Sequence, residues 1–235
     1  MKSGFPTSIK DIENINVRNK LLNLKKEDHI LGFLLQGSRV TGFGAPDTDW
    51  DIIIYCTDEY YKTLNYDSLT EFTFEGEGSD KRVVGDYAYF SDMIFEQQKN
   101  SPMDIDHIPY TLSVVLWDKT GKLGKWVETL SRFPDEDFED KSRMQLVQLL
   151  VAFGYARVNN QRNQLLDMKI NLNRAFTISL VLWFTLNKFW APQFKWWSKH
   201  VKRLNIDDEI FQLYNSCITE LSFENMEEIS RGQRN

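Results

Sequence analysis

The sequence predicts an α+β protein in which a domain with a small mixed β-sheet is followed by a C-terminal helical bundle. Strand-like and helix-like segments alternate over the first half of the chain, which is typical of an α/β layer. After Arg132 the strand signals fade and long helical patterns replace them, and the stretch Phe-Pro-Asp-Glu-Asp reads as a linker. We therefore expect one domain over residues 1–132 and a second over residues 133–235.

The composition of the chain narrows its function class. It has 235 residues, 42% of them hydrophobic, which is enough to fill the core of one large or two small domains. The net charge of −6 argues against a protein whose main role is to bind a nucleic-acid backbone. A locally basic groove is compatible with this charge. Cys56 and Cys217 lie far apart without the spacing of a metal site, and such scarce cysteines are typical of a reducing cytoplasm.

The sequence shows no targeting or membrane signal. The N-terminal stretch lacks the apolar region of a secretory signal. The longest apolar stretch covers residues 175–191 and contains Asn187 and Lys188, whereas a membrane span needs about 20 predominantly apolar residues. We expect a buried core helix there, and a cytoplasmic protein.

Elements of the first domain follow from local patterns. Apolar runs rich in β-branched and aromatic residues predict strands, and the turn signal Glu-Gly-Glu-Gly-Ser-Asp-Lys joins two of them. Amphipathic spacing and capping residues predict helices. The strands are expected over residues 31–36, 51–56, 69–75, 82–90 and 112–117, and the helical segments over residues 9–26, 39–43, 60–64 and 92–99.

Helical patterns fill the second domain. The first covers residues 141–166, and the residues at helical spacing in it are Met144, Val147, Leu150, Val151, Gly154 and Tyr155. Two further helices are expected over residues 169–189 and 207–221, the last with acids in its first turn. Three such helices predict a bundle.

Asp49 and Asp51 are the first candidate site residues. They begin the second predicted strand and are one residue apart, so both carboxylates point to one face while Trp50 turns the other way. Two close carboxylates repel each other unless a cation lies between them, so the pattern predicts a divalent metal. Gly37 and Ser38, at the end of the preceding strand, would hold phosphates: the glycine lets the backbone approach closely, and the serine supplies a hydroxyl before a helical turn.

Gly37-Ser38 followed ten residues later by Asp49-Trp50-Asp51, with Thr48 before the first aspartate, resembles the signature of the DNA polymerase beta-like nucleotidyltransferase superfamily. The resemblance implies that a nucleoside triphosphate, expected to be ATP, binds with Mg²⁺ on Asp49 and Asp51. It also implies transfer of AMP to a hydroxyl of an acceptor, with release of pyrophosphate.

The resemblance also calls for a third carboxylate on a following strand, and Asp86 is the candidate. It lies in the strand-like run Arg-Val-Val-Gly-Asp-Tyr-Ala-Tyr-Phe, where a charge is costly without a partner. It would serve as a metal ligand or as the general base. The alternative is an aspartate on the solvent face of an edge strand. Asp104 and Asp106 repeat the spacing, but Pro102 and Pro109 bracket them, so they are expected in a loop.

Further candidate binding residues come from a second resemblance and from the residue that follows Ser38. Residues 186–200 resemble a segment of bacterial nucleotidyltransferase-domain proteins, similar in layout to aminoglycoside and lincosamide nucleotidyltransferases. The resemblance implies that Lys195 would meet a phosphate and that Trp196 or Trp197 would stack on a base or line the acceptor pocket. Core packing is the alternative for the tryptophans. Arg39 would help hold the triphosphate, or it is a solvated helix residue.

The expected function is therefore Mg²⁺-dependent nucleotidyl transfer to a small molecule, an antibiotic being one candidate. The acidic balance favours a cationic acceptor over RNA. The alternatives are an enzyme that adenylylates a protein, as in a toxin–antitoxin pair, and a regulatory module that binds nucleotide without catalysis. Many relatives of the superfamily that the chain resembles bind their acceptor between two subunits, so a homodimer is one alternative. No P-loop or Rossmann glycine pattern competes.

Overall fold

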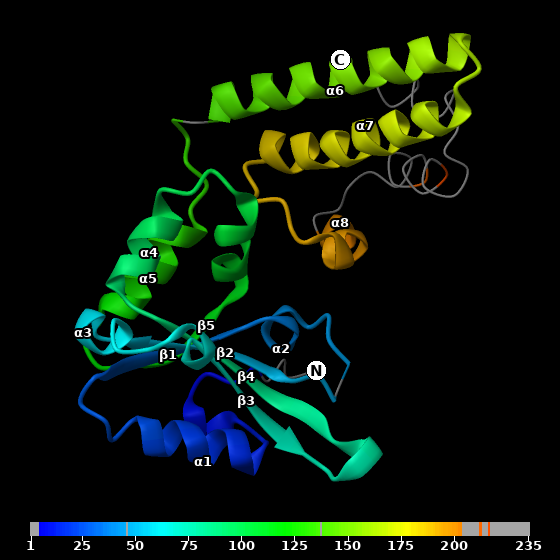
Figure 1. The fold of residues 1–235 in the computed structure, drawn as a ribbon. Coiled ribbons are helices and arrows are strands. Elements are labelled where there is room, and N and C mark those ends of the chain that lie inside the picture. The colour runs from blue at the N-terminus through cyan, green and yellow to red at the C-terminus, as the bar shows by residue number, and fades with distance from the viewer. Residues whose placement is uncertain (1–4, 46, 137, 204–211, 213–215, 217–235) are drawn as a thin grey trace. The chain divides into compact units, whose positions relative to one another are not determined.

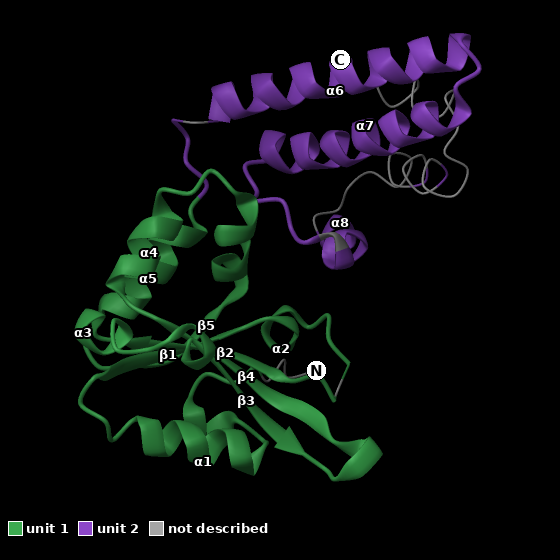
Figure 2. Cartoon of the chain, in the orientation of Figure 1, with its two compact units in different colours: residues 1–132 green, residues 133–235 purple. Residues whose placement is uncertain are grey.

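The computed structural model describes residues 5–45, 47–136, 138–203, 212 and 216. The chain divides into two compact units, Met1–Arg132 and Phe133–Asn235 (Figure 2). Each unit is described by itself below.

Unit 1 is built on a five-stranded mixed sheet with strand order β3-β4-β2-β1-β5 (Figure 1). The pair β2/β4 is parallel, and the other three pairs are antiparallel. The observed sheet confirms the predicted mixed architecture. The strands are β1 (Ile30–Gln36), β2 (Trp50–Cys56), β3 (Thr70–Glu75), β4 (Arg82–Phe90) and β5 (Val114–Asp118).

Helices cover the sheet on both faces: α1 on one, and α4 with α5 on the other (Figure 1). The helix expected from residue 9 begins only at Ile15, where the Asn14 side chain caps it by accepting hydrogen bonds from two backbone N–H groups. The helices of this unit are α1 (Ile15–Leu24), α2 (Ser38–Thr41), α3 (Asp58–Tyr61), α4 (Asp92–Lys99) and α5 (Lys122–Ser131).

β2 lies at the centre of the sheet and is buried on both faces, which explains its run of three isoleucines. Ile52 and Ile54 pack with residues of α1 in one core. Ile53 and Tyr55 pack on the other side, with residues of α4 and α5. Both faces of β2 are therefore held in place, and with them the aspartates at its start.

Asp92, the first residue of α4, ties the second core together. Its carboxylate accepts hydrogen bonds from the Tyr55 hydroxyl at 2.6 Å, from the Trp126 indole at 2.8 Å and from the Lys122 ammonium at 3.1 Å. Burial works against the charged form of Asp92, but these three donors outweigh it and lower the pKa of the carboxyl. One side chain thus joins β2, α4 and α5.

Unit 2 consists of helices in its described part. α6 (Phe138–Gln161) and α7 (Leu165–Leu186) run side by side (Figure 1), and α8 (Trp197–Arg203) follows a 3₁₀ turn. The two long helices confirm the helices expected over residues 141–166 and 169–189, each beginning a few residues earlier. Of the helix expected over residues 207–221 only residues 212 and 216 are described, so this prediction is not tested.

One leucine and two alanines of α6 pack against α7. Leu149, Ala152 and Ala156 are buried and pack with Leu172 and Ala175. Larger apolar residues that predict this helix lie on its other side and are exposed. They include Met144, Val147, Val151 and Tyr155.

Candidate functional site

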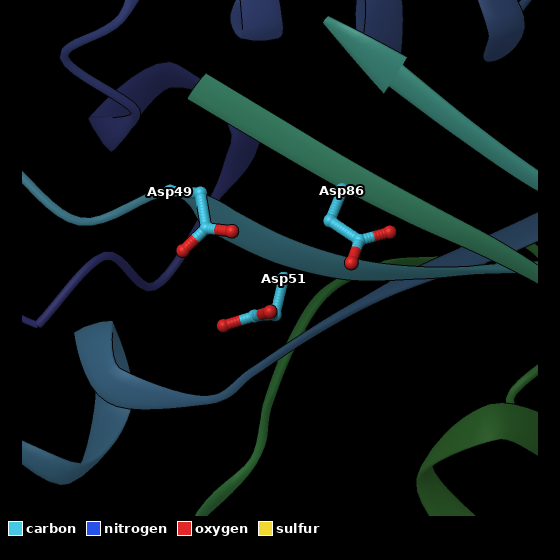
Figure 3. A group of neighbouring side chains, drawn as sticks. All are labelled: Asp49, Asp51 and Asp86. Atoms are coloured by element: carbon cyan, nitrogen blue, oxygen red, sulfur yellow. The ribbon is translucent and has the colours of Figure 1, made fainter. Parts of the chain in front are cut away.

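Asp49, Asp51 and Asp86 meet on one face of the sheet (Figure 3). Asp49 directly precedes β2, Asp51 lies within it, and Asp86 lies in β4. The three side chains are half-buried, and one carboxylate oxygen from each lies within 4.8 Å of the others. The structure therefore brings together the three aspartates that the sequence singled out.

The parallel register of β2 and β4 explains this meeting. Asp51 is the direct cross-strand partner of Asp86, so their side chains stand on the same face. Asp49 precedes Asp51 by two residues and points the same way, while Trp50 is buried in the core beside α1. Asp86 is not on an edge strand, because β3 and β2 flank β4.

The cluster has the electrostatics of a cation site. Burial raises the pKa of the Asp86 carboxyl, and the nearby charge of Asp49 raises it further. A divalent cation between the carboxylates would favour their charged form and so oppose the effects of burial and repulsion. Carboxylate oxygens are also the ligands that the hard ion Mg²⁺ prefers. The three carboxylates thus fit the divalent metal that the sequence predicts.

Gly37 lies against Asp51. Its φ of +73° and ψ of −153° form a conformation open to glycine and strained for other residues. A Cβ at this position would lie 1.8 Å from Oδ2 of Asp51. Gly37 is therefore required twice, by its backbone angles and by the carboxylate that fills the place of a side chain.

Ser38 begins α2 and is buried under the loop that follows it. A Cβ at Gly44 would lie 2.7 Å from the Ser38 Cβ and 2.9 Å from the Thr48 hydroxyl oxygen. The backbone N–H of Gly44 also donates to the Ser38 carbonyl at 3.4 Å. The described residues of the segment between α2 and β2 thus pack closely on Ser38, and this helps to position Asp49, which directly precedes β2.

Arg39 holds the segment that leads into the aspartates. Its Nε donates to the Thr48 carbonyl oxygen at 3.0 Å, and its guanidinium carbon lies 4.4 Å from the centre of the Trp50 ring. Arg39 is therefore not a freely solvated helix residue. No sequence pattern predicts that Arg39 holds this segment, because the partner of its side chain is a backbone carbonyl.

Gln36 is a residue near the site that the sequence did not single out. It is the direct cross-strand partner of Asp51 on β1. Its side-chain Nε2 is buried and has no hydrogen-bond partner among the described residues. A buried amide donor without a partner is costly, so this group has an unused donor next to the site.

The remaining predicted residues comprise a second Asp-x-Asp pair in unit 1 and three residues of unit 2. Asp104 and Asp106 form a 3₁₀ turn, as their flanking prolines suggest, and are not in the cluster. In unit 2, the ammonium of Lys195 lies 5.3 Å from the centre of the Trp196 ring. The Trp197 indole donates to the Pro192 carbonyl at 2.6 Å and the ring packs against the α6–α7 core, so this tryptophan is a packing residue.

Comparison with solved structures identifies a protein with a similar fold. The chain is similar to a nucleotidyltransferase-like protein from Exiguobacterium sibiricum 255-15, with a TM-score of 0.50 over 92% of this chain and 73% of that one. The fold is nucleotidyltransferase-like. The two sequences are only 10% identical. The similarity therefore shows a shared fold and does not indicate the substrate of this chain.

Sequence comparisons add one family match. A family described as a domain of unknown function (DUF4037) matches residues 108–197, which cover β5, α5 and most of the described part of unit 2. No match was found among curated proteins. Among the described residues, no helix is long and apolar enough to cross a membrane.

Proposed function

We propose that this protein is a nucleotidyltransferase that moves a nucleoside monophosphate, AMP from ATP, onto a hydroxyl of a small acceptor. The observation that carries the proposal is the meeting of three carboxylates on a nucleotidyltransferase-like fold, with Gly37 packed against one of them. Three carboxylates held this close together repel each other, so the arrangement favours a site that works with a bound cation.

Each residue has a proposed part in the transfer. The acceptor oxygen would attack the α-phosphorus in line, forming a new P–O bond while the bond to the β-phosphate breaks and pyrophosphate leaves. Asp86 would accept the proton of the acceptor hydroxyl, or share the metal. Gly37 and Ser38 would hold the phosphates, with Arg39 positioning the loop and Lys195 as a further phosphate contact. Mg²⁺ held by Asp49 and Asp51, with Asp86, would neutralise charge on the phosphates and polarise the phosphorus.

A cationic small molecule is the acceptor class that the charges favour. The whole net charge of −6 belongs to residues 1–132, because residues 133–235 contain 13 basic and 13 acidic residues. The unit with the three aspartates thus attracts cations and disfavours RNA. Binding of RNA with submicromolar affinity at physiological salt would contradict this acceptor class.

The first test is metal binding, because it needs no acceptor. Mn²⁺ in place of Mg²⁺ allows binding to be measured by electron paramagnetic resonance. Asp49→Asn and Asp51→Asn should each weaken the affinity at least about tenfold, since each removes a charged ligand. Asp47→Asn is the matched control: this exposed acid lies two residues from Asp49 but outside the cluster, so its loss should leave the affinity within about twofold.

The pH dependence of metal binding tests the role of Asp86. The metal binds the deprotonated carboxylate, and the pKa of Asp86 is raised. Affinity should therefore fall as the pH drops, beginning at a higher pH than for an ordinary aspartate. In Asp86→Asn this part of the pH dependence should be lost. A wild-type affinity that is constant down to the ordinary aspartate range would contradict the shared site.

The second test is transfer of label from α-³²P-ATP with Mg²⁺ to a panel of aminoglycosides, lincosamides and proteins. Label on a small molecule, lost in Asp49→Ala and kept in Asp47→Asn, would support the proposal. Label on a protein would instead favour the protein-modifying enzyme. ATP binding without transfer to any acceptor would favour the regulatory module.

A further inference from the structure

One side of α6 carries a row of exposed side chains that runs along the helix. At 100° per residue the row lies within a band about 80° wide, so it forms one straight face. Its central members are strongly exposed, Val147 and Tyr155 at 59% each and Val151 at 45%. We name this row the α6 seam: Asp140, Met144, Val147, Val151, Tyr155 and Val158 on α6, with Arg162 directly after its last residue.

The seam is separate from the contact with α7. The residues of α6 that pack in the unit 2 core, Leu149, Ala152 and Ala156, lie on the opposite side of the helix. Leu146 and Leu150, which are 40% and 44% exposed, lie beside the seam and outside its band. α6 therefore carries exposed apolar side chains in addition to the apolar side that faces α7. A helix with such exposed side chains in water needs a second partner, because exposed apolar area is costly.

The spacing of the seam residues is the same from either end, although the residue types differ. The spacing is 4, 3, 4, 4, 3, 4, symmetric about Val151. If two copies of α6 met antiparallel across a two-fold axis at Val151, Met144 of each copy would face Val158 of the other, and Val147 would face Tyr155. A two-fold contact requires such a surface, in which residue i meets residue j and j meets i.

The charges at the ends of the seam obey the same symmetry. Asp140 would face Arg162 of the second copy at both ends of the contact. Within one chain the two are about 33 Å apart along the helix, so they cannot pair with each other. Neither forms an ion pair with any other described residue. The seam thus matches itself in both apolar pattern and charge.

We propose that the α6 seam is the contact surface for a second copy of this chain, which makes the protein a homodimer through an antiparallel pair of α6 helices. The occupant is a second copy because palindromic spacing and oppositely charged ends are what self-complementarity requires, whereas an unrelated partner needs neither. The proposal does not depend on the proposed transfer reaction.

Sedimentation velocity on the full chain tests the dimer. The wild type should be a dimer at micromolar concentration, and Val151→Asp should be a monomer, because it places two like charges next to each other on the axis. Asn160→Asp is the matched control: it adds the same charge to an exposed residue on the other side of α6 and should stay dimeric. Circular dichroism checks that both variants are folded.

A charge exchange tests the pairing of Asp140 with Arg162 without touching the apolar residues. Asp140→Arg and Arg162→Asp should each raise the dimer dissociation constant about tenfold, because each places like charges together at both ends. The double variant should return it to within about threefold of the wild type. Such rescue has no explanation within one chain.

Three outcomes would overturn the proposal: a wild type that is monomeric at all concentrations, a dimer that Val151→Asp leaves intact, or single charge changes without effect. A monomer in which Cys217 resists maleimide until Val151→Asp is introduced would show instead that residues 204–235 cover the seam. Cys217 can report this because Cys56, the other cysteine, is buried in β2.

Discussion

At the scale of single residues, the contact between Gly37 and Asp51 links the loop after β1 to the cluster of three aspartates. The carboxylate of Asp51 occupies the space that a Cβ of residue 37 would need. The Gly-Ser pair therefore shapes the aspartate cluster directly, in addition to any contact with phosphates.

Gly37→Ala should move Asp51 and weaken Mn²⁺ binding at least about tenfold, since ligand geometry sets affinity. Gly121→Ala is a matched control: Gly121 has nearly the same φ, +72°, but nothing lies within 4 Å of its missing Cβ. Gly121→Ala should lose about 1–2 kcal/mol of unfolding free energy from its left-handed backbone, and Gly37→Ala should lose more, because its φ of +73° with ψ of −153° is a combination that only glycine adopts readily. Isothermal titration and chemical denaturation measure the two effects. Equal loss of metal affinity in both variants would contradict the role of the close contact.

Much of the residue pattern of the site could be predicted from the sequence. Asp49 and Asp51 follow from strand alternation, and Asp86 stands out as a charge inside an apolar strand. The roles of Arg39 and Gln36 could not be predicted, because one binds a backbone carbonyl and the other is placed by cross-strand register. Neither a backbone carbonyl partner nor a cross-strand partner can be recognised from the residues next to it in the sequence.

At the scale of elements, Asp92 holds α4 and α5 on the sheet through three hydrogen bonds. Asp92→Ala leaves the Tyr55 hydroxyl and the Trp126 indole without their acceptor, which should cost about 2–4 kcal/mol of unfolding free energy. Metal affinity should stay unchanged, because Asp92 is outside the cluster. Urea denaturation and Mn²⁺ titration measure the two quantities.

The control is Asp67→Ala, an exposed acid in a 3₁₀ turn, which should change stability by less than about 0.5 kcal/mol. The pKa of Asp92 is lowered in the fold, so its contribution is present at neutral pH. As the pH falls through the lowered pKa the contribution disappears, and wild type and Asp92→Ala should converge in stability. A constant difference down to that pH would contradict the role of the charged form.

Most elements, though not all, could be predicted from local pattern. α5 was missed because Gly124 and two lysines interrupt it, although Leu123, Trp126, Val127 and Leu130 have helical spacing. The strand order could not be predicted, because the parallel pairing of β2 with β4 joins segments separated by a helix and a strand. In α6 the spacing predicted the helix, but the alanines decided which side meets α7.

At the scale of the whole molecule, the chain has two units with separate cores. The two core clusters of the sheet lie within residues 1–132, and those of the helices lie within residues 133–235. The assignment of the first unit as the nucleotidyltransferase domain and of the second as the acceptor-binding domain stays a proposal.

The fragment 1–132 should fold alone, unfold in one cooperative thermal transition and bind Mn²⁺ as the full chain does, because its cores are complete. The fragment 1–120 is the control: it lacks α5, which supplies the buried Leu123 and Leu130, and should fail to fold. Calorimetry and metal titration decide the matter. A fragment 1–132 without a cooperative transition would show that unit 1 depends on unit 2.

The pairing of Asp51 with Asp86 has a consequence for folding. The side chains of a strand alternate between faces, so if β4 slipped by one residue along β2, Asp86 would turn to the opposite face of the sheet. A collapsed chain with misaligned strands would then present two carboxylates to an ion instead of three. A divalent cation that needs all three would therefore select the correctly aligned sheet, so metal affinity during refolding would measure strand alignment rather than compaction.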